Sequence, residues 1–96
     1  MFILPKELLN KFLEKYGEDE QLQQAMGECG ELIAACQNYH RAKMYGYKST
    51  SKSDLLREAV DVYFMIQQIR NMDPDLFDLL CQSKLKKVIN KFKNEG

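Results

Sequence analysis

The sequence predicts an all-α protein, a bundle of four helices in a single domain that covers residues 1–96. Ninety-six residues are enough for one hydrophobic core and too few for two. Apolar residues recur at helical spacing, and no stretch shows the strict alternation of a half-buried strand. The expected connections are short, which favours antiparallel neighbouring helices.

A proline and a glycine delimit the first expected helix. Pro5 suits the first turn of a helix, and Gly17 ends it. Its apolar face consists of Leu8, Leu9, Phe12 and Leu13. The second helix is expected from about Glu18 to about Lys43, with an apolar stripe that centres near Cys29.

The run YGYKSTSKS separates the second and third expected helices. Ser51 or Ser53 is expected to cap the third helix, which runs to about Asn71. Asp73 then caps the fourth helix and Pro74 occupies its first turn. This helix is expected to turn the following residues inward, onto the bundle: Leu76, Phe77, Leu80, Cys81, Leu85, Val88, Ile89 and Phe92.

Charge and cysteine content exclude several classes of protein. Fourteen basic residues balance fourteen acidic ones, so no net field draws the chain to nucleic acid or to an anionic membrane. The three cysteines lack CxxC spacing and sit in apolar helical patterns, which predicts buried thiols and, from these, a cytoplasmic location. The start MFILP is too short to span a membrane and is expected to pack on the domain or on a partner.

Two pairs of acids stand out, Glu28 with Glu31 and Glu58 with Asp61. Residues three apart on a helix have Cβ atoms about 5–6 Å apart, so both carboxylates of a pair can reach one point. The second pair lies in LLREAVDVYFMI, which is apolar almost all round. Such a helix is expected to pack against its own bundle on one side and against another chain on the other.

Four carboxylates that meet between two helices must be neutralised by protons or by a divalent cation. Ligands that are all oxygen favour Mg²⁺ or Mn²⁺ over zinc. A di-iron site of the bundle type would need Glu-x-x-His on two helices. The single histidine, His40, has Gln37 three residues before it, so the di-iron interpretation fails.

Structural alternatives remain open for both pairs. A Glu-x-x-Glu pair on an amphipathic helix commonly faces solvent without a further role. The second pair also has candidate salt-bridge partners in Arg57, Arg70 and the lysines of the last helix. Gly27 and Gly30 form a smooth strip beside Glu31, which suits either close helix packing or a flat ligand such as a base or a sugar.

Glu28-x-x-Glu31 followed after a loop by Glu58-x-x-Asp61 resembles the MazG-like nucleotide pyrophosphohydrolases, within the all-α NTP pyrophosphohydrolase superfamily. The similarity covers Gln21–Lys87, through ECGELIAACQNYHRAK, LLREAVDVYFMIQQI and SKLKK. It implies a MazG-like bundle in which the four acids bind Mg²⁺ and the metal holds a nucleoside triphosphate. It also implies hydrolysis to a nucleoside monophosphate and pyrophosphate, and assembly as a homodimer or homotetramer.

The resemblance implies roles for further residues. Lys84 and Lys87 match the basic residues that the family uses on its last helix, and they would contact the phosphates. A solvated helix face is the alternative for these lysines. Gln21 and Gln24 share a flank with Glu28 and are also expected to contact substrate. The chain has no tryptophan before the first acidic pair, and it has lysine where some relatives have arginine, so the relatives' base specificity does not carry over.

The sequence thus predicts a Mg²⁺-dependent enzyme that hydrolyses an NTP or dNTP by attack of a metal-activated water. Glu28, Glu31, Glu58 and Asp61 are the expected catalytic residues and metal ligands, and one of them could instead act as general base. The alternative is a non-catalytic helical module that binds a nucleotide or a partner protein in the same acidic groove.

Overall fold

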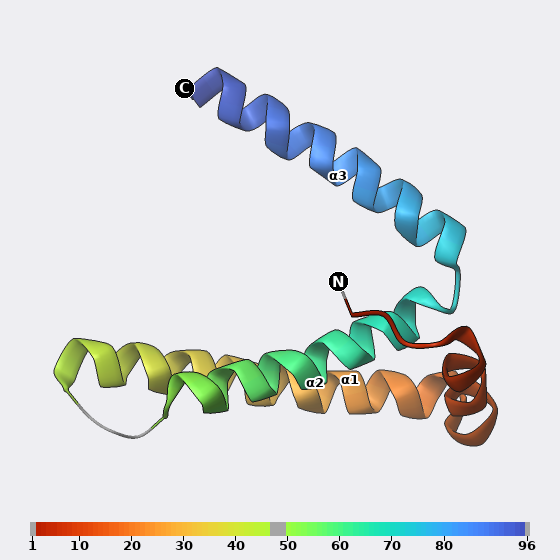
Figure 1. Cartoon of the computed structure of the whole chain (residues 1–96), viewed down its shortest axis with the longest axis horizontal. Coiled ribbons are helices and arrows are strands. Elements are labelled where there is room, and N and C mark those ends of the chain that lie inside the picture. The colour runs from red at the N-terminus through yellow and green to blue at the C-terminus, as the bar shows by residue number, and fades with distance from the viewer. Residues whose placement is uncertain (1, 47–49, 96) are drawn as a thin grey trace.

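The computed structural model describes residues 2–46 and 50–95, and all regular secondary structure in these ranges is helical. Three helices follow one another: α1 (Lys6–Tyr45), α2 (Lys52–Arg70) and α3 (Pro74–Glu95) (Figure 1). The all-α class is confirmed. The expected four-helix bundle is not found, because the described chain has three helices and the last of them stands apart from the other two.

Gly17 explains why three helices replace four. Its backbone has φ 77° and ψ 167°, in the left-handed region that favours glycine, and helical residues adjoin it on both sides. The chain therefore changes direction at this residue, and α1 consists of two helical arms that meet there. Figure 1 shows the first arm of α1 turned across the end of the long second arm. The sequence correctly predicts that a helical segment ends at Gly17, but the next segment follows directly after a kink, with no loop between them.

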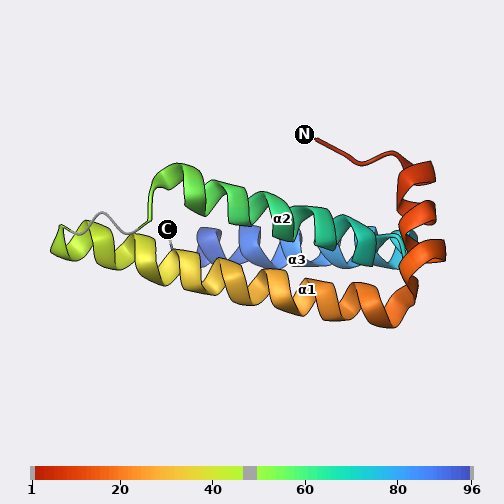
Figure 2. The same ribbon diagram turned by 90° about the horizontal axis from the view of Figure 1, so that it is seen from below.

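α1 and α2 lie side by side and antiparallel, as both Figure 1 and Figure 2 show. Ala25 and Ala35 of α1 and Val62 and Met65 of α2 are buried in the seam between them. Alanine has a short side chain, so the two helix backbones approach closely along this seam. The hydrophobic core of the described chain is thus centred on a helical hairpin.

Both ends of the connection between α1 and α2 are capped. Gly46 adopts a left-handed conformation and donates its N–H to the carbonyl of Ala42 at 2.9 Å, which ends α1. Ser51 begins α2 with a capping box: its Oγ accepts from the Asp54 N–H at 3.1 Å, and Asp54 Oδ2 accepts from the Ser51 N–H at 3.1 Å. Of the two serines proposed as caps, Ser51 is the one that caps.

The N-terminal segment packs on α2, as expected from its apolar residues. Leu4 is buried, and its N–H donates to Gln67 Oε1 at 2.6 Å. Tyr63 donates its hydroxyl to the carbonyl of Phe2 at 2.6 Å, and the Phe2 ring stacks on Phe64 with centroids 5.7 Å apart. These contacts cover part of the back of α2 with the chain's own residues.

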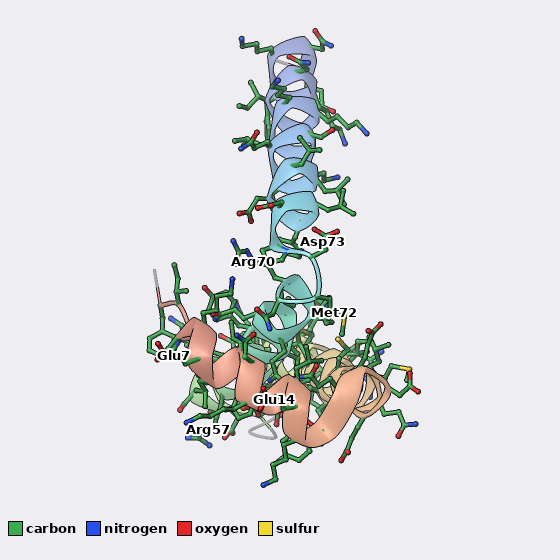
Figure 3. The ribbon with its side chains drawn as sticks, turned by 90° about the vertical axis from the view of Figure 1, so that its right-hand side faces the viewer. Glu7, Glu14, Arg57, Arg70, Met72 and Asp73 are labelled. Atoms are coloured by element: carbon green, nitrogen blue, oxygen red, sulfur yellow. The ribbon has the colours of Figure 1, made fainter. Side chains whose placement is uncertain are left out.

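α3 leaves the hairpin, and none of its described residues is buried (Figure 1). The expectation that its apolar residues face inward within this chain is wrong: Leu80 and Leu85 are each 59% exposed and Phe92 is 71% exposed. Figure 3 shows α3 standing clear of the hairpin.

Two interactions hold the base of α3. Arg70, at the end of α2, donates to both carboxylate oxygens of Asp78 at 2.7 and 3.0 Å, a bidentate ion pair. Asp73 accepts the N–H of Leu76 at 3.1 Å and so caps the helix, as the sequence predicts. The ion pair links the start of α3 to the end of α2, and the cap satisfies a backbone N–H in the first turn of α3.

The three cysteines, Cys29, Cys36 and Cys81, are exposed. The prediction of buried thiols is therefore wrong for the single chain, because the apolar stripes that contain them face solvent. None of the described helices is long and apolar enough to cross a lipid bilayer.

Candidate metal centre

Glu28 and Glu31 lie on the long arm of α1. Glu28 follows the buried residues Gln21 and Ala25 by seven and three positions, so helical geometry turns it toward α2. It is half-buried in the seam, whereas Glu31 lies further round the helix and is exposed. The two acids of this pair therefore differ in their contact with water.

Glu58 and Asp61 form the corresponding pair on α2. Glu58 precedes the buried residues Val62 and Met65 by four and seven positions, which places it on the face that packs against α1. Glu58 is half-buried and Asp61 is exposed. Each helix thus contributes one carboxylate from within the seam and one from its rim.

Glu28, Glu31 and Glu58 converge. Each offers one carboxylate oxygen, and these three oxygens all lie within 4.8 Å of one another. Asp61 is outside this group, but its negative charge raises the pKa of both Glu28 and Glu58. The structure therefore brings three of the four expected acids together and places the fourth within electrostatic range.

Among the described residues, no lysine or arginine side chain forms an ion pair with Glu28, Glu31 or Glu58. Arg57 and Arg70, two of the salt-bridge partners considered for the α2 pair, bind other acids at 3.4 and 2.7 Å. One oxygen of Glu28 and one of Glu58 (Oε2 in each) are buried without a hydrogen-bond partner. Buried acceptors without a partner are uncommon in folded proteins, so these two oxygens point to a missing proton or ligand.

Two physical causes raise the pKa of Glu28 and Glu58 above the ordinary value of 4.5. Loss of hydration is the largest cause for each, because burial disfavours the charged form. Glu31 comes next through charge repulsion and also shares a hydrogen bond with each of them, and Asp61 adds further repulsion. The group is therefore a place where added positive charge, as protons or as a cation, lowers the free energy.

The donor set suits a hard divalent cation. Two oxygens bound to one Mg²⁺ at 2.0–2.1 Å lie at most about 4.2 Å apart. Adjacent ligands of an octahedral Mg²⁺ lie only about 3 Å apart. The three oxygens lie within 4.8 Å of one another, so side-chain rotations that move them by about 1–2 Å would bring all three into range. His40 is exposed and is not part of the group, so the donors in the described chain are carboxylates alone.

The two glutamines assigned to substrate lie in different environments. Gln21 is 1% exposed, and its Nε2 donates to Gln68 Oε1 at 2.9 Å across the seam. Gln24 is exposed. The amide pair of Gln21 and Gln68 links α1 to α2 two helical turns before Glu28, and so helps to set the register in which the acids meet.

The link between Gln21 and Gln68 is a feature that the sequence analysis did not predict. The available signal is that Gln68 continues the buried stripe of α2 three positions after Met65. A polar residue on a core stripe needs a partner when it is buried, and Gln21 occupies the equivalent position on α1.

The basic residues of α3 do not approach the acids within this chain. Lys84 and Lys87 are exposed on α3, which points away from the hairpin (Figure 1). The glycine strip is open as well: Gly27 and Gly30 are exposed, and a Cβ added at either would meet no atom within 4 Å. No other helix of the described chain packs against this strip.

No protein-family model, curated protein or solved structure matches this chain. Membership of the MazG-like family therefore stays a prediction, and a function must be inferred from the side chains themselves.

Proposed function

We propose that this chain is a Mg²⁺-dependent nucleoside triphosphate pyrophosphohydrolase, which converts an NTP or dNTP to the monophosphate and pyrophosphate. The observation that carries the proposal is the convergence of Glu28, Glu31 and Glu58, whose oxygens lie within 4.8 Å without a basic partner among the described residues. The reaction class comes from the resemblance of the two acidic pairs to those of MazG-like enzymes.

The acids have distinct roles in this proposal. Glu28 and Glu58 hold the cation from within the seam, since each has a buried oxygen without a partner, and Glu31 completes the group from the rim. Asp61 is exposed and lies outside the group of three, a position that suits either a fourth ligand or the general base. Bound Mg²⁺ or Mn²⁺ would neutralise phosphate oxygens and lower the pKa of the attacking water.

The substrate contacts complete the proposal. Lys84 and Lys87 would meet the phosphates as point charges, and exposed Gln24 is available to the nucleotide. Because α3 stands away from the hairpin, these lysines need either a different position of α3 or a second copy of the chain to reach the acids. Assembly as a homodimer or homotetramer and a cytoplasmic location belong to the same proposal.

The separation of the lysines from the acids favours a second candidate function. A site with carboxylates but without phosphate-binding cations could bind a metal–nucleotide complex, or a partner protein, without turnover. In that case the acidic seam would act as a binding module.

One experiment distinguishes the two candidates. NTPs and dNTPs are incubated with the protein and Mg²⁺, and pyrophosphate and orthophosphate are both measured. The enzyme releases pyrophosphate, and the Glu58→Gln variant does not. Orthophosphate as the single phosphorus product would contradict the proposed bond cleavage. A rise in Tm with nucleotide and Mg²⁺, without product after long incubation, would support the binding module.

A further inference from the structure

A cavity lies where the N-terminal segment, the end of α2 and the start of α3 meet. Its volume of about 690 Å³ falls within the range of about 300–1,000 Å³ that is usual for small-molecule sites. Figure 1 shows the N-terminal segment passing beside the end of α2 at this junction. None of the four acids of the candidate metal centre lines the cavity. Gln67, which does line it, lies nine residues after Glu58, about 13.5 Å along the helix, so the two sites are separate.

The walls of the cavity are mostly apolar. Leu4 and Leu9 are buried side chains of the N-terminal region, and Ile66 of α2 and Phe77 of α3 line the other sides. Side chains from segments that are distant in sequence therefore enclose one apolar space. Such a lining suits an alkyl chain or an aromatic ring, because ligand sites are mainly apolar and use a few polar groups to fix orientation.

Gln67 places an unpartnered hydrogen-bond donor in the wall. The residue is 8% exposed, and its Oε1 accepts from the Leu4 N–H at 2.6 Å. This bond fixes which end of the amide is the oxygen, and the other end, Nε2, is buried without a hydrogen-bond partner. Buried donors without a partner are uncommon in folded proteins, so Nε2 points to an acceptor from outside the chain.

The charged side chains of the lining favour an anion. Two are basic, Lys6 and Arg70, and one is acidic, Asp78, which leaves an excess of one positive charge. Arg70, labelled in Figure 3 at the base of α3, already binds both carboxylate oxygens of Asp78. Lys6 is exposed and forms no ion pair among the described residues. The groups of the lining that need a partner are therefore donors, Gln67 Nε2 and Lys6 Nζ.

The segment that covers Gln67 is able to give way to a ligand. Residues 2–5 have no regular secondary structure, and hydrogen bonds at Phe2 and Leu4 hold them to α2. Ile3, between these two contacts, is 73% exposed. A small shift of this short segment would open Gln67 Nε2 to a ligand oxygen without moving either helix of the hairpin.

We propose that this cavity binds a small monocarboxylate with an apolar body, of the size of a medium-chain fatty acid. The apolar body lies between Leu9, Ile66 and Phe77, and the carboxylate accepts hydrogen bonds from Gln67 Nε2 and Lys6 Nζ. A carboxylate suits the site better than an alcohol or an amine, because it only accepts hydrogen bonds and carries the charge that balances the lining. The ligand contacts the N-terminal segment, α2 and α3 together, so its binding holds α3 at its angle to the hairpin. This inference does not depend on the proposed catalytic activity.

Three probes with the same alkyl chain test the head group. Octanoate, octanol and octylamine are titrated into the metal-free protein at neutral pH and followed by calorimetry. Octanoate should bind at least about tenfold more tightly than octylamine, with octanol between them, because only the carboxylate pairs with both donors. Absence of octanoate binding at millimolar concentration, or equal affinity for octanoate and octylamine, would overturn the proposal.

A matched pair of variants on α2 tests the place. Ile66→Trp fills the cavity from a side chain that is 41% exposed, whereas Val60→Trp makes a similar change at a residue that is 51% exposed and outside the lining. Ile66→Trp should lower the affinity for octanoate at least about tenfold, and Val60→Trp should leave it unchanged. Circular dichroism checks that both variants keep their helices. Equal affinities would show that octanoate binds elsewhere, such as on the exposed apolar face of α3, and would contradict the cavity site.

Two further substitutions test the donors. Gln67→Glu keeps an oxygen for the Leu4 N–H but replaces Nε2 with a second, negatively charged oxygen, so octanoate affinity should fall at least about tenfold while octanol still binds. Lys6→Gln should lower octanoate affinity by about two- to fivefold, the effect of an exposed ion pair, and Lys11→Gln is its control outside the lining. An octanoate affinity that Gln67→Glu leaves unchanged would rule out the proposed contact.

Heteronuclear NMR of the wild-type protein locates the ligand directly. Octanoate should shift the side-chain amide signals of Gln67 and the backbone amide signals of Leu4 and Phe77, and should leave those of Glu28 and Glu31 in place. Shifts confined to the rest of α3 or to the acids, with the Gln67 side-chain amide unmoved, would overturn the proposal. This readout needs neither nucleotide nor metal, so it can fail while the proposed enzyme activity stands, and the reverse.

Discussion

The α1·α2 hairpin and α3 carry similar apolar stripes, yet they differ in what those stripes contact. In the hairpin, Val62 and Met65 are buried against α1, and a pair of glutamines links the two helices. In α3, most of the apolar side chains face solvent, and no described residue is buried. The difference shows that helical periodicity identifies an apolar face but does not say which element, or which chain, covers it.

The charged side chains of the hairpin and of α3 also differ in how far they are buried. Glu28 and Glu58 of the hairpin are half-buried between the helices, where burial and repulsion from Glu31 and Asp61 raise the pKa of both carboxyl groups. The lysines of α3 remain exposed and apart from them. The proposed chemistry therefore belongs to the hairpin, whereas α3 presents an apolar face that its own chain leaves largely exposed.

The largest effect is expected when an acid of the hairpin is neutralised. Glu28→Gln should lower pyrophosphate release at least about a hundredfold, because residues that merely orient metal ligands already contribute about 10–100-fold. Glu20→Gln is the matched control, an exposed acid eight positions earlier on the same helix, and should keep wild-type activity. Equal rates for both variants would place the reaction outside the hairpin.

Truncating an apolar side chain should reduce the stability of the protein more in the hairpin than in α3. Met65→Ala removes a side chain that is 6% exposed in the seam and should lower the free energy of unfolding by about 2–5 kcal/mol. Leu79→Ala removes an exposed side chain from α3 and should change it by less than about 0.5 kcal/mol. Urea denaturation followed by circular dichroism measures both. A larger loss for Leu79→Ala than for Met65→Ala would reverse the comparison.

The capping box should contribute a smaller share of hairpin stability. Ser51→Ala removes the acceptor for the Asp54 N–H and should lower the free energy of unfolding by about 1 kcal/mol. Ser53→Ala lies two positions later, on an exposed residue of the same helix, and should have little effect. If the two variants unfold at the same urea concentration, the cap does not stabilise the hairpin.

The smallest of these effects should be the change of folding stability with pH in the metal-free protein. Because the folded chain raises the pKa of Glu28 and Glu58 above 4.5, it binds more protons than the unfolded chain between pH 4.5 and the raised values. The contribution of these groups to stability is therefore full below this window and is lost as the pH rises through it.

Thermal unfolding from pH 4 to pH 8, in a chelator, measures this trend. Glu58→Gln should weaken it, and Mg²⁺ should raise the Tm of the wild type more at pH 8 than at pH 4, since the cation binds the ionised carboxylates. A Tm that rises with pH equally in wild type and Glu58→Gln would contradict the repulsion between the acids.

Several local features follow from the sequence because they depend on neighbouring residues alone. Ser51 and Asp73 cap their helices as predicted, and Gly17 marks a change of direction at the predicted residue. The spacing of Glu28 to Glu31 placed both acids on one flank of a helix, and the apolar setting of Glu58 indicated its partial burial. Local backbone geometry and helical periodicity are enough for each of these conclusions.

The tertiary structure decided the features that depend on how the helices meet. It brought the oxygens of Glu28, Glu31 and Glu58 together and left Asp61 at the rim, because the offset between α1 and α2 is set by packing across the seam. It also left the cysteines exposed and α3 without a partner in its own chain, contrary to the sequence-based expectation. An amphipathic pattern specifies that a face avoids water, and the long-range contacts specify what covers it.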